Sequence, residues 1–268
     1  MRNRVCRGRY GEMIFPVEDV WVGRSFGLYG EFSELETDAF KRTVKAGDVV
    51  VEAGANIGAH TVLLSQLVGD AGRVFAFEPQ RLVYQTLCGN LALNSIENVF
   101  AYEMALGDVA GRMSMEAPVT STGVNVGGGR LVEEASDGVP VRTLDSFGLE
   151  RLDFLKADVE GFEGRLLSGA VETIGRCRPL LYVENDRGDR DVLIGRIRDL
   201  GYEVWWHRPP LFNPENVNRN PADVFMFRVG VDEYGIFVSE NLLCAPVERE
   251  FGAVVESWES AGEYEKAG

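Results

Sequence analysis

The sequence has few cysteines, and they are not arranged as a zinc cluster or a disulfide framework. All four are scattered through the chain without a C-x-x-C pair, the spacing that many zinc and redox sites use. Reduced thiols of this kind are typical of a cytoplasmic protein. We therefore expect a cytoplasmic location and no disulfide pairing among the cysteines, which are Cys6, Cys88, Cys177 and Cys244.

Long apolar runs are also lacking. No run approaches the roughly 18 residues of a membrane-spanning helix, and the N-terminus has no apolar core of a secretory signal. We therefore expect no transmembrane segment. The 268 residues, 45% hydrophobic and 10% aromatic, are enough for one large domain with extensions and argue against disorder.

Basic residues are scarce. The chain has 27 Lys and Arg against 42 Asp and Glu, a net charge of −15. Because proteins bind nucleic-acid phosphates through Lys and Arg, we expect no nucleic-acid partner. The basic residues at the N-terminus could contact an anionic membrane or a partner, but we interpret them as a solvated, frayed end. They are Arg2, Arg4, Arg7 and Arg9, and residues 248–268 form the opposite, acidic end.

Short β-rich runs alternate with helical patterns from residue 48 onward, which predicts a parallel α/β sheet. Helices are expected from the apolar spacing between these runs, the first over residues 57–68. The strands are expected at residues 48–52, 73–78, 98–105, 153–158 and 179–184.

Two regions depart from this alternation. Residues 111–138 are rich in Gly, Ser and Thr, so we expect a hairpin or flap there rather than a helix. Residues 202–206 and 223–229 read as late strands without an intervening helix. That pattern predicts an antiparallel strand at or near the edge of the sheet.

The turn after the first core strand suggests a nucleotide-type ligand. Gly54, Asn56 and Gly58 lie between a strand and a helix, where glycines allow close backbone approach and the helix start offers free N–H groups. A dinucleotide fingerprint would need glycine at positions 56 and 59, where the chain has Asn56 and Ala59. S-adenosylmethionine needs no phosphate contact, and Glu52 supplies the acidic surroundings that its ammonium and sulfonium groups favour.

Two further acidic residues fit an adenosine ligand. Glu78 ends the second strand, 24 positions after Gly54, where a carboxylate can accept both ribose hydroxyls; NAD sites use the same contact. Asp108 follows the third strand and is placed to accept from an adenine. Simple structural roles stay open: a tight turn at Gly54, a solvated Glu78, and a turn formed by Asp108 with Gly107.

Five motifs in order resemble the FkbM-type S-adenosylmethionine-dependent methyltransferases. The resemblance covers roughly residues 20–246 and ends in Asn241-Leu-Leu-Cys-Ala-Pro246. The motifs are Asp48-Val-Val-Val-Glu-Ala-Gly-Ala-Asn-Ile-Gly58, Phe77-Glu-Pro79, Ala105-Leu-Gly-Asp108, Val141-Arg-Thr-Leu-Asp145 and Leu155-Lys-Ala-Asp-Val-Glu-Gly-Phe-Glu163.

This resemblance implies a Rossmann-like class I methyltransferase fold: a seven-stranded, mostly parallel sheet with helices on both faces and an antiparallel late strand. It also implies O-methylation of a hydroxyl on a sugar, glycan or natural product. We expect an N-terminal extension or lid over residues 1–47, the methyltransferase domain over 48–246 with the flap at 111–138, and an acidic tail over 247–268. The oligomeric state stays open, a homo-oligomer being one option.

Methyl transfer to a hydroxyl needs in-line positioning and removal of a proton. Asp158 and Glu184 end neighbouring strands, at the edge where open α/β sheets bind ligands, and we expect them to be catalytic. A divalent metal between them is an alternative that we do not favour, because no histidine joins the carboxylates. The family has a histidine shortly after the strand-five Glu, where this chain has Asn185 and Asp186, so the identity of the base stays open.

Other interpretations remain. His60 is expected to be a packed or capping residue, while His207 is either a base or substrate contact or a structural residue of an edge strand. A nicotinamide oxidoreductase is an alternative that the missing glycines disfavour. A non-catalytic cofactor-binding module is another, for which Asp158 and Glu184 would be replaced by neutral residues.

Overall fold

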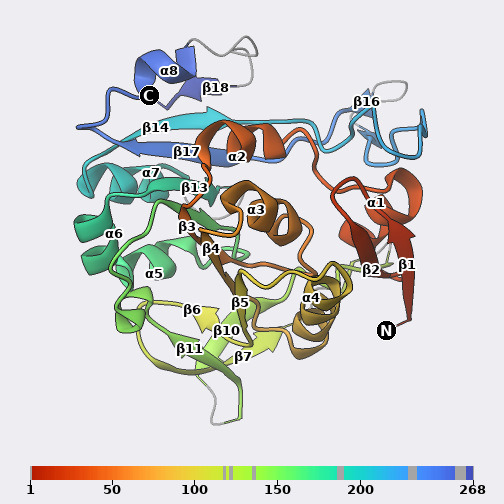
Figure 1. The fold of residues 1–268 in the computed structure, drawn as a ribbon, viewed down its shortest axis with the longest axis horizontal. Coiled ribbons are helices and arrows are strands. Elements are labelled where there is room, and N and C mark those ends of the chain that lie inside the picture. Colours follow the sequence, from red (N-terminus) through yellow and green to blue (C-terminus); the bar gives the residue numbers. More distant parts are fainter. Residues whose placement is uncertain are drawn as a thin grey trace.

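A mixed eight-stranded sheet crosses the centre of the molecule (Figure 1). The computed structural model describes residues 2–116, 119–120, 123–134, 137–185, 190–228, 234–256 and 264–267. The strand order is β18-β14-β17-β13-β12-β3-β4-β5. Five adjacent strands are parallel: β5 (Val99–Tyr102), β4 (Arg73–Phe77), β3 (Val49–Ala53), β12 (Phe154–Ala157) and β13 (Leu180–Glu184).

The other three strands complete one side of the sheet. β17 (Asn241–Pro246) runs antiparallel to both of its neighbours, β13 and β14 (Tyr202–His207), and β18 (Tyr264–Lys266) pairs antiparallel with the outer side of β14. The Rossmann-like α/β class is therefore confirmed, with β18 as one strand more than the seven expected. This strand comes from the acidic C-terminal segment.

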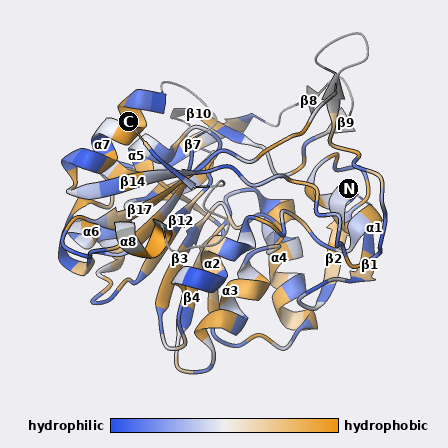
Figure 2. Cartoon of the chain, turned by 90° about the horizontal axis from the view of Figure 1, so that it is seen from above, coloured by the Kyte–Doolittle hydropathy of each residue, from blue (hydrophilic) through white to orange (hydrophobic). Residues whose placement is uncertain are grey.

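Helices cover both faces of the sheet. α2 (Thr37–Thr43), α3 (Thr61–Val68) and α4 (Arg81–Leu93) pack on one face. α5 (Glu163–Ser168), α6 (Val171–Cys177) and α7 (Arg190–Asp199) pack on the other face. In Figure 2 these helices carry hydrophobic and hydrophilic residues side by side, the pattern of helices that bury one side on a sheet.

Outside the main sheet lie several smaller elements. They include the helices α1 (Val22–Tyr29) and α8 (Gly252–Glu256), and the 3-10 turn η1 (Leu144–Phe147). Residues 111–138 form hairpin strands in their described part, where β10 pairs antiparallel with β7. The small strands are β6 (Ala105–Leu106), β7 (Gly111–Glu116), β8 (Val119–Thr120), β9 (Gly123–Val124), β10 (Arg130–Glu134), β11 (Val139–Arg142), β15 (Phe227–Arg228) and β16 (Tyr234–Gly235).

Three local predictions are wrong. Residues 3–7 form β1 (Asn3–Arg7), which pairs with β2 (Glu12–Pro16) rather than fraying. The helix expected from residue 57 begins at Thr61, because Asn56 and Gly58 have the left-handed φ values of 52° and 89°. An antiparallel late strand at or near the sheet edge is present, as β17 and as the edge strand β18. The strand expected at 223–229 is not part of this sheet, because residues 227–228 form β15 in a separate hairpin; residue 229 lies outside the described residues.

Within the part of the chain that the structure describes, no helix is both long and apolar enough to cross a membrane.

Candidate active site

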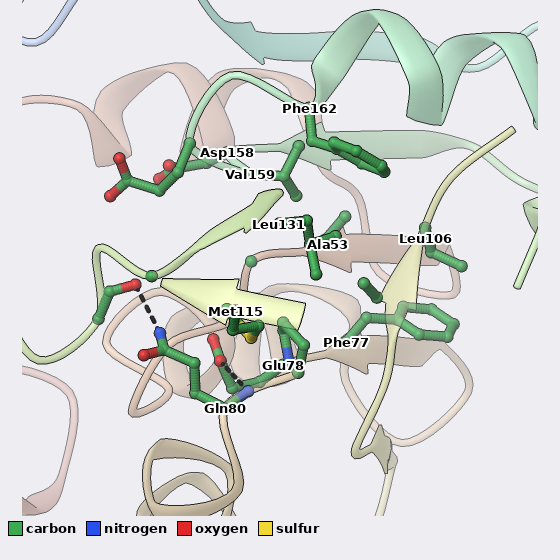
Figure 3. A pocket seen from close by; sticks show the side chains of 16 residues that line it. Ala53, Phe77, Glu78, Gln80, Leu106, Met115, Leu131, Asp158, Val159 and Phe162 are labelled. Atoms are coloured by element: carbon green, nitrogen blue, oxygen red, sulfur yellow. Dashed lines mark hydrogen bonds between the residues drawn. The ribbon is translucent and has the colours of Figure 1, made fainter. Parts of the chain in front are cut away.

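Two adjoining cavities open at the carboxyl edge of the parallel strands. The narrow cavity, of about 40 Å³, lies against the ends of β3 and β4 (Figure 3). The wide cavity, of about 180 Å³, lies beside it toward the N-terminal segment. Gly54, Asp158 and Glu160 line both cavities, so the end of β12 separates the two spaces.

The narrow cavity combines apolar walls with one buried carboxylate. Figure 3 shows Glu78 and Gln80 on one side, facing Asp158 and Phe162 on the other. Glu78 is 2% exposed and accepts backbone N–H bonds from Asn56 at 3.0 Å and from Gln80 at 2.8 Å. Burial raises the pKa of Glu78 to about 7. The remaining walls come from Phe77, Leu106, Met115, Leu131 and Val159.

The flap segment closes one side of this cavity. Gly127 and Gly129 line it, and the Gln80 side-chain amide donates a hydrogen bond to the carbonyl of Gly127 at 2.8 Å. Side chains added at either glycine would meet Asn56 or Gln80. The glycines at 127–129 therefore allow the flap to approach the strand ends closely.

The conformation of the turn after β3 explains two of its residues. Gly54 has φ +80°, and a Cβ atom there would lie 1.7 Å from the carbonyl oxygen of Asp158. Asn56 has φ 52° and caps its own turn, since its side-chain oxygen accepts from the Ile57 N–H at 2.7 Å. The space beside Gly54 is thus filled by β12, and the turn brings these two strand ends together.

The wide cavity has an aromatic wall and a charged floor. The Trp21 ring lies 4.8 Å from the ring of Phe237 and stacks on Phe225 at 5.6 Å. Trp21, Phe32, Leu211 and Phe237 line the space, and all of them lie outside the core strands. The floor consists of Glu36, Glu52, His60, Lys156, Asp158, Glu160 and Glu184.

Lys156 is the central residue of this floor. It lies in β12 beside Glu52 of β3 and Tyr182 of β13 in register, so the three side chains form a row on the face covered by α2 and α3. Its side chain is 2% exposed, and its Nζ donates a hydrogen bond to Asp158 Oδ2 at 3.0 Å. Burial alone would lower the pKa of Lys156, but the charges of Asp158, Glu52 and Glu36 outweigh burial and raise it.

Two buried carboxyl groups accompany this lysine. Burial raises the pKa of Glu52 to about 7, and Glu52 accepts a hydrogen bond from the Thr61 hydroxyl at 2.6 Å. Glu36, just before α2, also has its pKa raised to about 7 by burial and accepts from the Ser33 hydroxyl at 2.7 Å. The N-terminal segment therefore contributes an acid to a site built on the core sheet.

His60 faces the same cavity. It is buried, packs edge-on against Phe40 at 5.2 Å, and its Nε2 has no hydrogen-bond partner among the described residues. Burial, followed by the positive charge of Lys156, lowers the pKa of His60 well below its ordinary value. The imidazole is therefore neutral, and its side chain makes no capping hydrogen bond to α3.

The structure brings together six of the eight residues that we expected at the site. Glu52, Gly54, Asn56, Glu78, Asp158 and Glu184 line the cavities, whereas Gly58 and Asp108 line neither.

Asp108 and His207 have partners elsewhere. Asp108 accepts a hydrogen bond from the Arg165 guanidinium at 2.8 Å, which lowers its pKa, and its contact with adenine stays a prediction. His207 is fully buried, bonded through Nδ1 to the Tyr182 hydroxyl at 2.8 Å and stacked on Tyr264 at 4.3 Å. It lines neither cavity.

Sequence reasoning missed Lys156, Glu36 and the aromatic wall. A signal for Lys156 existed, because it is one charge in a strand that is otherwise Phe, Leu and Ala. Glu36 and Trp21 gave no such signal, since only the path of the N-terminal segment brings them to the strand ends. In the described residues, no group of three or more His, Cys, Asp or Glu side chains is arranged to hold a metal.

Known proteins resemble this chain in sequence and fold. The methyltransferase sdnD of Sordaria araneosa is 29% identical over 191 residues, which cover 58% of this chain and 73% of that protein. The crystal structure of methyltransferase FkbM from Methylobacillus flagellatus KT has a TM-score of 0.50 at 19% identity. The alignment covers 76% of this chain and 47% of that one, so the chain spans about half the length of that structure. The family model of the methyltransferase FkbM domain matches residues 52–204, more than half of the sequence, and the chain therefore belongs to the FkbM methyltransferase family.

Proposed function

We propose that the protein is an S-adenosylmethionine-dependent O-methyltransferase that methylates a hydroxyl of a small acceptor, such as a sugar, a glycan or a natural product. The observation that carries this proposal is the position of Asp158. It lies between a narrow cavity suited to an adenosine and a wide cavity with space for a second molecule. A transfer reaction between two bound molecules needs this arrangement.

The residues of the narrow cavity fit the cofactor. Glu78 presents a carboxylate whose orientation is fixed by two backbone N–H bonds, and a carboxylate accepts from both hydroxyls of a ribose. Phe77, Leu106 and Phe162 supply an apolar slot for a purine ring. When bound, S-adenosylmethionine supplies an electrophilic methyl group on a sulfonium.

The wide cavity fits the acceptor. Its aromatic wall of Trp21, Phe32 and Phe237 can pack on the apolar face of a ring and exclude water from the floor. Asp158 is the group that we assign to take the hydroxyl proton, because it stands between the two cavities. We assign Glu184, which lines the acceptor side only, to bind and orient the acceptor.

We further propose roles for the segments around the core. Residues 1–47 act as a lid, since Trp21 and Glu36 reach the wide cavity from this segment. The flap at 111–138 covers the cofactor side through Gly127 and Gly129. Residues 48–246 carry the transfer reaction, and within the acidic segment 247–268 the strand β18 extends the sheet edge rather than the site.

Calorimetric titration with S-adenosylhomocysteine and, separately, with NAD tests the cofactor. We expect micromolar binding of S-adenosylhomocysteine and no binding of NAD; binding of NAD alone would contradict the proposal. Methyl transfer from tritiated S-adenosylmethionine to a panel of monosaccharides, inositols and phenols then tests the acceptor class. A chelator series in the same assay decides whether a metal takes part.

A further inference from the structure

The floor of the wide cavity offers a hydrogen-bond donor and an acceptor side by side. Lys156 Nζ and Asp158 Oδ2 are 3.0 Å apart, and both residues line the cavity. An ammonium group carries three N–H donors, so Lys156 can hold Asp158 and still donate to a ligand. A carboxylate likewise has further lone pairs for a second donor.

This pair matches the two needs of a single hydroxyl group. A hydroxyl oxygen accepts one hydrogen bond while its O–H donates another. An acceptor hydroxyl above the pair can therefore accept from Lys156 and donate to Asp158 at the same time. The positive charge of Lys156 makes the acceptor hydroxyl more acidic without a metal ion, because a fixed positive charge stabilises the developing alkoxide.

We propose that Lys156 is a further catalytic residue, which binds the oxygen of the acceptor hydroxyl and stabilises its negative charge during transfer. This inference rests on the proposed methyltransferase function. Lys156 keeps its proton throughout, since Glu36, Glu52 and Asp158 surround it with negative charge. It acts as a cationic hydrogen-bond donor, and Asp158 remains the base.

The acceptor oxygen forms a bond to the methyl carbon, and the methyl–sulfur bond breaks with its electron pair remaining on sulfur as a neutral thioether. The hydroxyl proton passes to the carboxylate of Asp158 and leaves later to solvent. Lys156 keeps its proton and its hydrogen bond to Asp158 throughout the step.

The competing role for a lysine at this place is to bind the carboxylate of the cofactor's methionine moiety. Lys156 lines the wide cavity and not the slot around Glu78, which favours the acceptor role. Calorimetry with S-adenosylhomocysteine and with methylthioadenosine, which lacks the amino and carboxylate groups, separates the two roles. The variants are Lys156→Met and, as a matched control, Lys45→Met, at an exposed lysine whose ammonium group donates to the Arg42 carbonyl and lines neither cavity.

We expect Lys156→Met to bind both ligands within threefold of wild type. A loss above tenfold for S-adenosylhomocysteine, with methylthioadenosine unchanged, would place Lys156 on the cofactor and overturn the proposal. If wild type binds neither ligand, the proposed function itself fails. Because Lys156→Met leaves Glu36 and Glu52 without their cation, the double variant Glu36→Gln/Lys156→Met repeats the test with a smaller charge imbalance.

A binding measurement on the unchanged protein tests the hydroxyl contact directly. The chain has four lysines, Lys41, Lys45, Lys156 and Lys266, so the Lys156 ammonium signal in a nitrogen-15 spectrum can be assigned by its loss in Lys156→Met. Glycerol, small enough for the wide cavity, is titrated into the complex with S-adenosylhomocysteine. We expect the Lys156 signal to shift while that of Lys266 does not, and an unmoved Lys156 signal overturns the proposal.

Turnover with the best acceptor of the panel completes the test. Loss of one fixed donor to a developing oxyanion lowers kcat by about 10²–10³-fold. We expect this loss in Lys156→Met, with a smaller loss in Lys156→Arg because the positive charge is kept. A kcat within threefold of wild type for Lys156→Met would contradict the assignment.

Discussion

Gly54 is the position at which one added methyl group should disturb the site most. In the wild type, an ideal Cβ atom at this residue would lie 1.7 Å from the carbonyl oxygen of Asp158 and 2.8 Å from its carbonyl carbon. Both neighbours are backbone atoms, so they cannot rotate away. Gly54→Ala must therefore push the ends of β3 and β12 apart, and the end of β12 carries Asp158.

The expected loss of stability has two parts. A residue with a side chain pays about 1–2 kcal/mol at the left-handed φ of +80°. Forcing packed backbone apart adds about 1–3 kcal/mol, so Gly54→Ala should lower the free energy of unfolding by about 2–5 kcal/mol. For a chain of this size each kcal/mol corresponds to roughly 2–4 °C in Tm.

Gly47 provides a matched control. Its φ is +87°, and a Cβ atom there would meet no other atom within 4 Å. Gly47→Ala should therefore lower the free energy of unfolding by the conformational part alone, about 1–2 kcal/mol. Denaturant unfolding of both variants, with calorimetry of S-adenosylhomocysteine binding, gives the comparison. Equal destabilisation of the two variants, or unchanged ligand binding by Gly54→Ala, would refute the argument that strand contact requires this glycine.

Three further predictions concern carboxyl groups of the site. Asp158→Asn should lower turnover by about 10²–10⁴-fold while S-adenosylhomocysteine affinity stays within threefold by calorimetry; near-normal turnover would remove Asp158 as the base. Glu78→Gln should weaken S-adenosylhomocysteine by about 10–100-fold, the value of a charged hydrogen bond, with Glu103→Gln, at an exposed residue, as the unaffected control. Burial raises the pKa of Glu52 from 4.5 to about 7, so the folded state holds its proton more tightly than the unfolded state does. Its contribution to stability is present below pH 4.5 and lost as the pH rises through about 7. Unfolding free energies at pH 5 and pH 8 should thus differ less in Glu52→Gln than in wild type, and an unchanged difference would contradict this.

The core of the fold could be predicted because its signals are local. The runs around Val51, Phe75 and Leu155 are short and apolar, and each is followed by a turn and a helical pattern, so the α/β class followed from these runs together with the family motifs. β17 was not recognised as a strand, because Asn241-Leu-Leu-Cys-Ala-Pro246 has no β-branched residue. Its place between β13 and β14 depends on pairing partners far away in sequence.

The cavity-lining residues that could be located from the sequence are those at strand ends. Glu52, Glu78, Asp158 and Glu184 close their strands, so the topology alone brings them to one edge. The wall of the wide cavity, which we propose as the acceptor side, could not be predicted, since Trp21, Glu36 and Phe237 come from segments whose path is set by tertiary packing. The contact of Asp108 with an adenine stays a prediction: its position in the chain fits a ligand contact, and its carboxylate also accepts a hydrogen bond from Arg165.

The carboxylates at the strand ends would by themselves make the site negatively charged, but the site also contains a buried cation. Lys156 lies buried among them, and burial raises the pKa of Glu36, Glu52 and Glu78 to about 7. The charge of the cavities therefore changes near neutral pH, because these groups take up or release protons there. A cationic ligand favours their ionised forms, and a neutral ligand does not. The proposed sulfonium cofactor and its neutral thioether product should for this reason differ in affinity mainly above pH 7, where the carboxylates are charged and Lys156 is the one cation opposing them among the described residues that line the cavities.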